Sequence, residues 1–376
     1  MFLLPLRSNF YISNYYNYNI FLFRCKQKFV IKLTKFYIIS CSLSIIVLLS
    51  AEFSYSLDSI FSLWYSLGVT IKRKAAKILE LTEKCELCPR KCGANRLSGK
   101  NGFCGGGKEI KVARAALHFW EEPCISGEEG SGTVFFSGCT MHCVFCQNRE
   151  ISRGEAGKLV SVERLSQIFL ELQEKGANNI NLVTPMHYAP QIINALDLAR
   201  EKGLRLPIVW NTGGWELPES VEAVKNHADI WLSDFKYFDN SLAEKFSNAK
   251  NYFEIASASL KKMVEQTGEA VFDDDGMMKK GVIVRHLVLP GHTDDSKKIL
   301  RWLWENFGDK IWISIMNQYT PLCSDENFPE LSRAVTDEEY DEVIDFAVSL
   351  GIENAFVQEG GAVSESFIPP FDLEGV

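Results

Sequence analysis

After Gly132 the sequence alternates apolar runs with amphipathic stretches of helical length, and this alternation limits the fold more than any other feature. The apolar runs, which we predict to be strands, are residues 133–137, 179–183, 207–211, 230–234, 282–288 and 311–316, with a further one at 355–357. Predicted helices follow at 162–175, 190–202, 296–306 and 337–350. Strands separated by such helices pair in parallel, and six or more units curl towards a barrel. An open doubly wound sheet is the alternative.

Charge is unevenly distributed along the chain. The 376 residues carry a net charge of −8, and residues 1–70 hold six Lys or Arg against Glu52 and Asp58, so the remainder is strongly acidic. An acidic body lacks the basic surface that neutralises phosphates, which argues against nucleic acid as a partner. Proteins or small molecules are the expected partners.

Residues 1–70 have a different composition from the rest of the chain. No Asp, Glu or Gly occurs before residue 51, and residues 36–51 are uncharged and follow a basic segment. A membrane anchor over residues 36–57 is one interpretation, although the run is shorter than a spanning helix needs. The others are a soluble extension, or a start codon assigned too early, with translation beginning near Leu67 or Val69. A short amphipathic helix is predicted at 73–81.

Eight of the eleven cysteines lie between Cys85 and Cys146, a clustering that favours metal ligation over a disulfide framework. A reducing compartment, the cytoplasm, is therefore expected. Cys139, Cys143 and Cys146 supply three thiolates, which leaves one iron of a four-iron, four-sulfur cluster open to a ligand. Structural zinc or disulfide cysteines are the alternative.

A second group has the spacing of a four-ligand site, and its members are Cys85, Cys88, Cys92 and Cys104. Four thiolates can hold a structural zinc ion or an auxiliary iron–sulfur cluster, and the spacing does not decide between them. The remaining cysteines are expected to be ordinary thiols or to belong to the N-terminal segment; they are Cys25, Cys41, Cys124 and Cys323.

Polar residues follow most of the predicted strands, where the chemistry of a barrel is found. They are Gly138-Cys139, the run from Thr184 to His187, the run from Asn211 to Gly214, Asp234 with Lys236, and Pro290-Gly291-His292. Asp274-Asp275-Gly276 is predicted to be a hairpin turn before the fifth strand.

The run GCTMHCVFCQN, with Phe145 before its third cysteine, resembles the signature of the radical S-adenosylmethionine superfamily. From about residue 80 onward, CELCPRKCGANR, HFWEEPCISG, INLVTPMHY, DIWLSDFKY, VRHLVLPG and SESFIPPFD look like proteins similar to pyruvate formate-lyase activating enzymes. The resemblance implies an α/β fold, a partial (βα)6 TIM-like barrel with an N-terminal cysteine-rich extension. The implied domains are residues 1–70, 71–125 and 126–376.

The resemblance implies a reaction in which a 4Fe-4S cluster on Cys139, Cys143 and Cys146 reductively cleaves S-adenosylmethionine to a 5′-deoxyadenosyl radical. Activases then abstract hydrogen from a glycine of a glycyl-radical enzyme, and flavodoxin or ferredoxin is the implied electron donor. A radical enzyme acting on a small metabolite is the alternative. A non-catalytic electron-transfer or zinc-binding module is a third, which the open iron argues against.

The resemblance also suggests roles for individual residues. Asp234 and Lys236 match the Asp-x-Lys run that activases carry close to the cofactor and target glycine. Phe145 is expected beside the adenine, and the cofactor-binding residues are further expected to include Thr184, Asn211 and His286, although a satisfied core histidine is an equal reading of His286. One departure concerns Thr184-Pro185-Met186-His187, because activases typically have Gly-Gly-Glu there to contact the amino group of the cofactor.

Overall fold

The computed structural model describes residues 83–321, 326–358 and 368–376, and the backbone of four strands before residue 50. The chain divides into two compact units, Met1–Arg73 and Lys74–Val376. The strands of the first unit form an antiparallel sheet in chain order: β1 (Phe21–Cys25), β2 (Lys28–Leu33), β3 (Phe36–Cys41) and β4 (Ser44–Leu49). Among the described residues, no helix has the length and hydropathy that crossing a membrane requires. The helix predicted at 73–81 lies outside the described residues.

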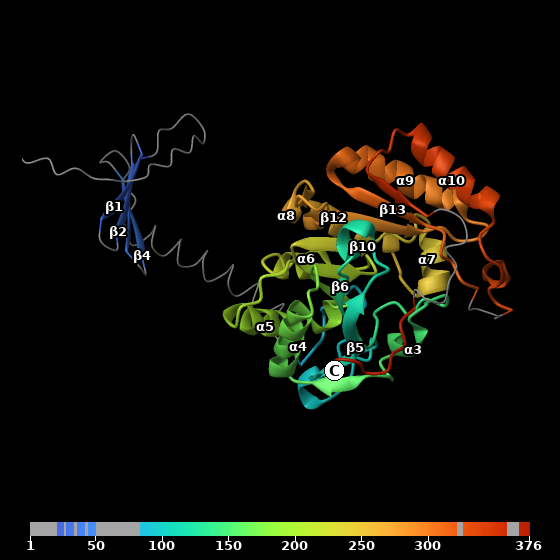
Figure 1. Cartoon of the computed structure of the whole chain (residues 1–376), viewed down its shortest axis with the longest axis horizontal. Coiled ribbons are helices and arrows are strands. Elements are labelled where there is room, and N and C mark those ends of the chain that lie inside the picture. Colours follow the sequence, from blue (N-terminus) through green and yellow to red (C-terminus); the bar gives the residue numbers. More distant parts are fainter. Residues whose placement is uncertain are drawn as a thin grey trace, which may run out of the picture. The chain divides into compact units, whose positions relative to one another are not determined.

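The second unit is built on one mixed sheet, and Figure 1 shows its helices packed around it. Neighbouring parallel strands follow the order of the chain: β6 (Ser131–Phe136), β8 (Ile180–Val183), β9 (Ile208–Thr212), β10 (Ile230–Asp234), β12 (Met278–Leu287), β13 (Trp312–Met316) and β14 (Ala355–Val357). Beyond β6, the antiparallel β5 (Ile110–His118) pairs with β6 and with β7 (Lys158–Val160). Helical connections join successive parallel strands, as the alternation predicted.

The helices that cover the sheet are α4 (Val162–Glu174), α5 (Ala189–Glu201), α6 (Pro218–Ala223), α7 (Asn240–Ser247), α8 (Tyr252–Thr267), α9 (Thr293–Phe307) and α10 (Asp337–Ser349), with the short α2 (Pro123–Ser126) and α3 (Arg149–Ser152). The predicted strands and helices of residues 133–357 are confirmed, with ends that differ by a few residues. The predicted hairpin is also confirmed, because β11 (Val271–Phe272) pairs with β12 across Asp274-Asp275-Gly276. The sequence reading did not name the strands β5 and β7, the helices α6, α7 and α8, or the short α2 and α3.

Local signals in the sequence explain where these helices begin. The Ser161 hydroxyl accepts a hydrogen bond from the N–H of Arg164 at the start of α4. Leu165, Ile168 and Leu172 then recur at helical spacing on the buried face of this helix. At α10, Thr336 and Glu339 form a reciprocal capping box.

Side chains alternate along the strands between two apolar clusters, one between the sheet and its helices and one on the inner face of the sheet. Trp210 and Trp231 belong to the main apolar cluster, whereas Val209, Ile230 and Ile283 pack in a separate cluster with α2. Because successive strand residues point to opposite faces, one residue faces the helices and the next faces the interior. The sheet curls enough for residues of all seven parallel strands to line one cavity, and its end strands β14 and β7 are not paired with each other. The predicted α/β class and the partial barrel are confirmed.

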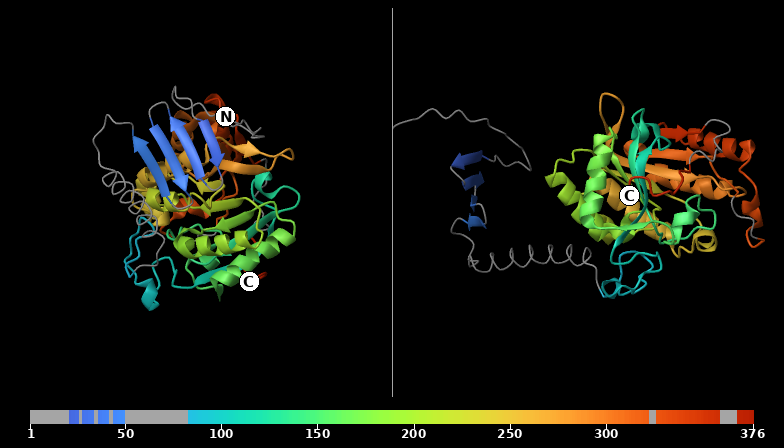
Figure 2. Two further views of the ribbon diagram at one scale, coloured as in Figure 1. Left: turned by 90° about the vertical axis from the view of Figure 1, so that its left-hand side faces the viewer. Right: turned by 60° about the horizontal axis from the view of Figure 1, so that its bottom comes forward.

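The C-terminal residues return to the β5 side of the sheet. The N–H of Ala115 donates to the carbonyl of Glu374 at 2.8 Å, and the N–H of Leu373 donates to that of Ala113 at 3.2 Å. Figure 1 shows the C-terminus beside β5, and Figure 2 marks this end of the chain in two further views. Residues 110–125, the end of the region predicted to be cysteine-rich, thus contribute β5 to the same sheet as the barrel strands and most of α2 to the interior.

Candidate functional site

The three cysteines of the expected cluster lie on the loop that follows β6. This loop leaves the strand at Gly138, where φ is +102° and a Cβ atom would lie 2.1 Å from the carbonyl oxygen of Cys104. Only glycine fits such a close approach. The Sγ atom of Cys139 accepts from the N–H of Met141 at 3.4 Å, and that of Cys143 accepts from the Ser247 hydroxyl at 2.9 Å. All three cysteines line the same cavity.

The electrostatics of these thiols suit a cationic centre. Burial raises the pKa of Cys143 to about 11. Burial also raises the pKa of Cys146, and the charges of Cys143 and Cys139 raise it further. Three thiolates that share one buried cavity need compensating positive charge, which an iron–sulfur cluster supplies. Within the described part of the chain, no three His, Cys, Asp or Glu side chains already meet in the arrangement of a bound metal ion. The three cysteines therefore fit an iron–sulfur cluster because all three offer thiolate ligands and all three line the same cavity.

The cavity has a volume of about 630 Å³, within the range of small-molecule sites. It lies at the carboxyl ends of the parallel strands, where sequence analysis expected the chemistry. Of the predicted site residues, the lining includes Cys139, Cys143, Cys146, Phe145, Thr184, Asn211, Asp234 and Lys236. Four of the five predicted polar groups therefore meet here, and Pro290-Gly291-His292 does not line the cavity.

Asp234 is held between two cations. Its carboxylate lies 2.5 Å from Nζ of Lys236 and 2.9 Å from Nε of Arg285. Burial alone would raise the pKa of Asp234, but the charges of Lys236 and Arg285 lower it below its ordinary value. Asp234 is thus an ionised partner of two largely buried cations.

The network extends to Glu121, which the sequence reading did not single out although it lies in the quoted HFWEEP run. Its carboxylate lies 3.1 Å from Nη1 of Arg285 and accepts from the amides of Asn181 at 3.1 Å and Asn211 at 3.3 Å. Nη2 of Arg285 also donates to the Asn211 amide oxygen at 2.6 Å. This polar layer forms the floor of the cavity.

Thr184 lines the cavity with φ of +56°, a conformation that β-branched residues rarely adopt. Its N–H donates to the carbonyl of Asn211 at 2.9 Å, which ties the ends of β8 and β9 together. Backbone strain of this kind gathers at functional sites. It occurs at the position where the activase pattern has glycine.

The two histidines that sequence analysis considered are both buried. For His286 the expected cofactor contact is corrected, because Nδ1 bonds to the Phe235 carbonyl and Nε2 to the Ser296 hydroxyl, each at 2.8 Å. It alternates with Arg285 along β12, so it faces the helices while Arg285 faces the cavity. His187 bonds through Nε2 to the carbonyl of Ser137 at 3.0 Å and lies against the second cysteine group.

That second group converges on one place. Cys85, Cys88, Cys92 and Cys104 line a common small pocket together with Arg90, Arg96 and His187. The chain turns there through hydrogen bonds from the N–H of Gly93 to the Cys85 carbonyl at 3.0 Å and from that of Lys91 to the Cys88 carbonyl at 3.0 Å. A Cβ atom on Gly102 would lie 3.4 Å from the sulfurs of both Cys92 and Cys104.

This segment is fastened to the cluster loop. Arg90 donates from Nε to the carbonyl of Thr140, next to Cys139, at 2.9 Å, and from Nη2 to that of Asn248 at 2.9 Å. Arg96 is buried and donates to the carbonyl of His187 at 2.7 Å. The two cysteine groups are therefore neighbours that share hydrogen-bonded connections.

Glu216 is a further cavity residue that the sequence reading missed. It follows β9 after two glycines and a tryptophan, is 5% exposed, and has no hydrogen-bond partner at Oε2. Burial raises its pKa to about 8. The Gly-Gly pair directly after a strand was the sequence signal that could have indicated this close-packed loop.

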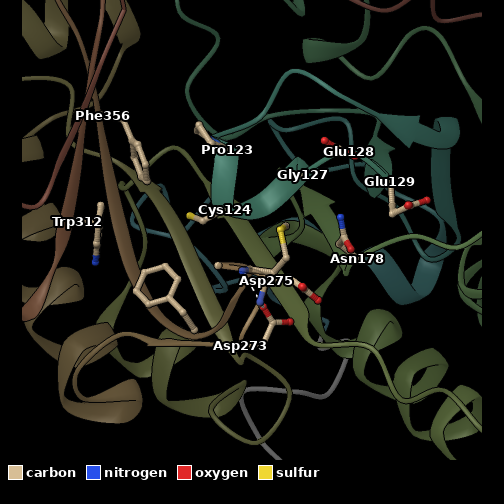
Figure 3. Close-up of a pocket in the computed structure, with 13 residues that line it drawn as sticks. Pro123, Cys124, Gly127, Glu128, Glu129, Asn178, Asp273, Asp275, Trp312 and Phe356 are labelled. Atoms are coloured by element: carbon tan, nitrogen blue, oxygen red, sulfur yellow. Dashed lines mark hydrogen bonds between the residues drawn. The ribbon is translucent and has the colours of Figure 1, made fainter.

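A larger groove of about 880 Å³ lies near the opposite ends of the strands (Figure 3). Pro123 and Cys124 of α2, Asp273 and Asp275 of the hairpin, and Trp312 line it. Cys124 is a buried free thiol, as predicted, and burial raises its pKa to about 12. None of the seven cysteines of the two expected metal-binding groups lines this groove, so the smaller cavity is the candidate active site.

Comparisons with known proteins agree with this geometry. Residues 133–303 match the Radical SAM superfamily. The uncharacterized protein MJ0674 of Methanocaldococcus jannaschii is 28% identical over 279 residues, which cover 72% of this chain and 76% of that protein. Pyruvate formate-lyase-activating enzyme of Clostridium pasteurianum is 26% identical over 172 residues, 44% of this chain and 65% of that enzyme.

Among solved structures, Streptococcus suis SuiB bound to S-adenosylmethionine is similar at 12% identity and a TM-score of 0.39, covering 59% of this chain and 48% of SuiB. A domain of pyruvate-formate lyase-activating enzyme from Bacteroides vulgatus is similar at 14% identity and a TM-score of 0.30, covering 52% of this chain and 91% of that domain. The chain thus spans about half the length of SuiB. On its cysteine loop, its α/β barrel and the match over residues 133–303, this part of the chain is a radical S-adenosylmethionine domain.

Proposed function

We propose that the chain is an activase-like radical enzyme that abstracts a hydrogen atom from a glycine of a protein substrate. The match of residues 133–303 to the Radical SAM superfamily implies a 4Fe-4S cluster and S-adenosylmethionine as cofactors. When bound, the cluster supplies the electron that cleaves S-adenosylmethionine to a 5′-deoxyadenosyl radical. The observation that carries the proposal is the convergence of Cys139, Cys143 and Cys146 on one cavity at the carboxyl ends of the strands.

The residues around the cysteines have separate roles in this proposal. Cys139, Cys143 and Cys146 hold the cluster, and the buried apolar ring of Phe145 offers a surface for the adenine. Lys236 lowers the pKa of Cys143 and Cys146 against the effect of burial, so it favours the thiolate form of both. Asn211 and Arg285 present polar groups to a ligand in the cavity. The similarity to the Clostridium pasteurianum activating enzyme supports a protein glycine as hydrogen donor.

Replacement of Cys143 by Ala tests the chemistry. The anaerobically reconstituted variant should form less than a hundredth of the 5′-deoxyadenosine of the wild type, because one iron loses its protein ligand. Cys124→Ala is the matched control, since it removes a buried cysteine outside the cluster loop, and it should keep its iron. Full iron content and full product yield in Cys143→Ala would refute the assignment.

The hydrogen donor is tested separately with deuterium. A candidate glycyl-radical enzyme carrying dideuterated glycine should transfer deuterium to 5′-deoxyadenosine and gain a glycyl radical signal in electron paramagnetic resonance. Deuterium transfer from a small metabolite, without such a signal from any protein partner, would favour the metabolite-modifying alternative. Reduced flavodoxin or ferredoxin is the electron donor to supply in both arms.

For the second cysteine group we propose a metal centre held by Cys85, Cys88, Cys92 and Cys104. Three of these side chains are buried and all four line one pocket with two arginines, whose positive charges would offset a four-thiolate site. Both a zinc ion and an auxiliary iron–sulfur cluster use four thiolates. The centre would be structural, because it lies beside the cluster loop and outside the main cavity.

A further inference from the structure

Among the acidic residues that line the cavity, Glu122 and Glu216 each have a buried Oε2 atom without a hydrogen-bond partner in the described structure. Glu121 and Asp234 are both paired with Arg285. The charge of Arg285 opposes the rise that burial causes in the pKa of Glu122, whereas no cation opposes it at Glu216. A buried carboxylate of this kind is costly unless a ligand supplies hydrogen-bond donors or positive charge.

The loop that carries Glu216 is fixed in place. Gly214 has φ of +82°, and a Cβ atom there would lie 2.0 Å from the carbonyl oxygen of Asp234. Trp215 donates from Nε1 to the carbonyl of Lys250 at 3.2 Å, and the Ser259 hydroxyl donates to the Glu216 carbonyl. The backbone that carries this buried side chain is therefore fixed before a ligand binds.

This loop also lies against the cysteine loop. A Cβ atom on Gly213 would lie 3.0 Å from Sδ of Met141, which stands between Cys139 and Cys143. Glu216 acts electrostatically on Cys139, where its charge adds to burial in raising the pKa of the thiol. Glu216 thus lines the cavity near the loop that carries Cys139.

We propose that Glu216 receives the amino group of the amino-acid moiety of the ligand in this cavity, which for the proposed cofactor is that of S-adenosylmethionine. The inference rests on the proposed function. This chain lacks the Gly-Gly-Glu run after β8. In the proposal, Glu216 on the loop after β9 contacts the amino group instead. Glu216 would be a binding residue that positions the ligand against the cysteine loop.

The test measures binding to the reconstituted holoenzyme by anaerobic calorimetry, with Glu216→Gln as an isosteric uncharged variant. Binding of S-adenosylmethionine and S-adenosylhomocysteine should weaken at least tenfold, because both carry the amino group. Binding of 5′-methylthioadenosine, which lacks the amino-acid moiety, should change less than twofold. Glu219→Gln removes an exposed carboxylate three residues away and should leave all three affinities unchanged.

Iron content and the melting temperature without ligand provide the check on folding. Glu216→Gln should keep its iron and melt at the same or a higher temperature, since it removes a buried, unpartnered carboxylate. Unchanged S-adenosylmethionine affinity, or equal weakening of all three ligands, would overturn the assignment of the amino group to Glu216. A wild-type protein with full iron that binds no S-adenosylmethionine would instead refute the proposed function.

Discussion

At the scale of single residues, Asp234 illustrates how a buried charge depends on its partners. Sequence analysis expected its carboxylate at the cavity mouth, and the structure adds Lys236 and Arg285, both within 3 Å. Replacing one member of such a set leaves buried charge uncompensated, which generally costs about 3–5 kcal/mol. Arg285 keeps Glu121 as a second partner, whereas Lys236 loses its carboxylate.

We therefore predict that Asp234→Asn lowers the free energy of unfolding at pH 7 by about 3 kcal/mol, measured by urea denaturation. The pKa of Asp234 is lowered in the folded state. Its ionised form therefore adds to the free energy of unfolding above the ordinary aspartate pKa, and this stabilisation is lost as the pH falls through the lowered value. The difference between variant and wild type should shrink accordingly in acid.

Asp372→Asn is the control for this prediction. It removes a carboxylate that lies 2.6 Å from Arg114 and is about half exposed, and exposed pairs contribute at most about 1 kcal/mol. Equal, small losses in both variants would show that Asp234 is a solvated strand end.

At the scale of elements, the sequence predicted what depends on local pattern. The parallel strands from β6 to β14 were evident because each is an apolar run between helical stretches. β5 was missed because its residues 110–118 mix Lys and Arg with alanines, and its strand conformation depends on pairing with β6 and on the C-terminal residues. The cavity cysteines were predictable from spacing, whereas the pairing of Arg285 with Asp234 depends on register between β10 and β12.

The second cysteine group allows a prediction at the same scale. A variant with Cys139, Cys143 and Cys146 all changed to Ala keeps only this group, so its metal content after reconstitution reports on that site alone. About one zinc per chain would identify a structural zinc site, and about four irons would identify an auxiliary cluster. Neither metal after reconstitution with both would contradict the proposed centre.

Cys88→Ser, made in the otherwise native chain, tests whether the second centre stabilises the cluster held by Cys139, Cys143 and Cys146. Arg90, two residues later, donates to the carbonyl of Thr140 in the cluster loop. Loss of the second centre should therefore loosen this loop and speed the loss of iron from the remaining cluster when a chelator is added. Cys124→Ala again serves as the control.

At the scale of the whole molecule, the C-terminal residues connect β5 to the active site. Ile368 and Pro369 line the main cavity, and the residues after them are held by Arg114, which bonds to Asp372 and Glu374. Gly375 completes the contact, because its φ is +72° and a Cβ atom there would lie 2.0 Å from the carbonyl oxygen of Ala115. The wall of the cavity thus depends on how the last residues pack against β5.

We predict that Gly375→Ala releases these residues and weakens S-adenosylmethionine binding several-fold, because Ile368 and Pro369 lose their support. Carboxypeptidase digestion should shorten the variant faster than the wild type, and calorimetry should report the weaker binding. Gly176→Ala is the matched control, since Gly176 has φ of +87° with no atom within 4 Å of an added Cβ. It introduces similar backbone strain, about 1 kcal/mol, without the clash. If both variants resist digestion and bind alike, the contact with Ala115 does not hold the cavity wall in place.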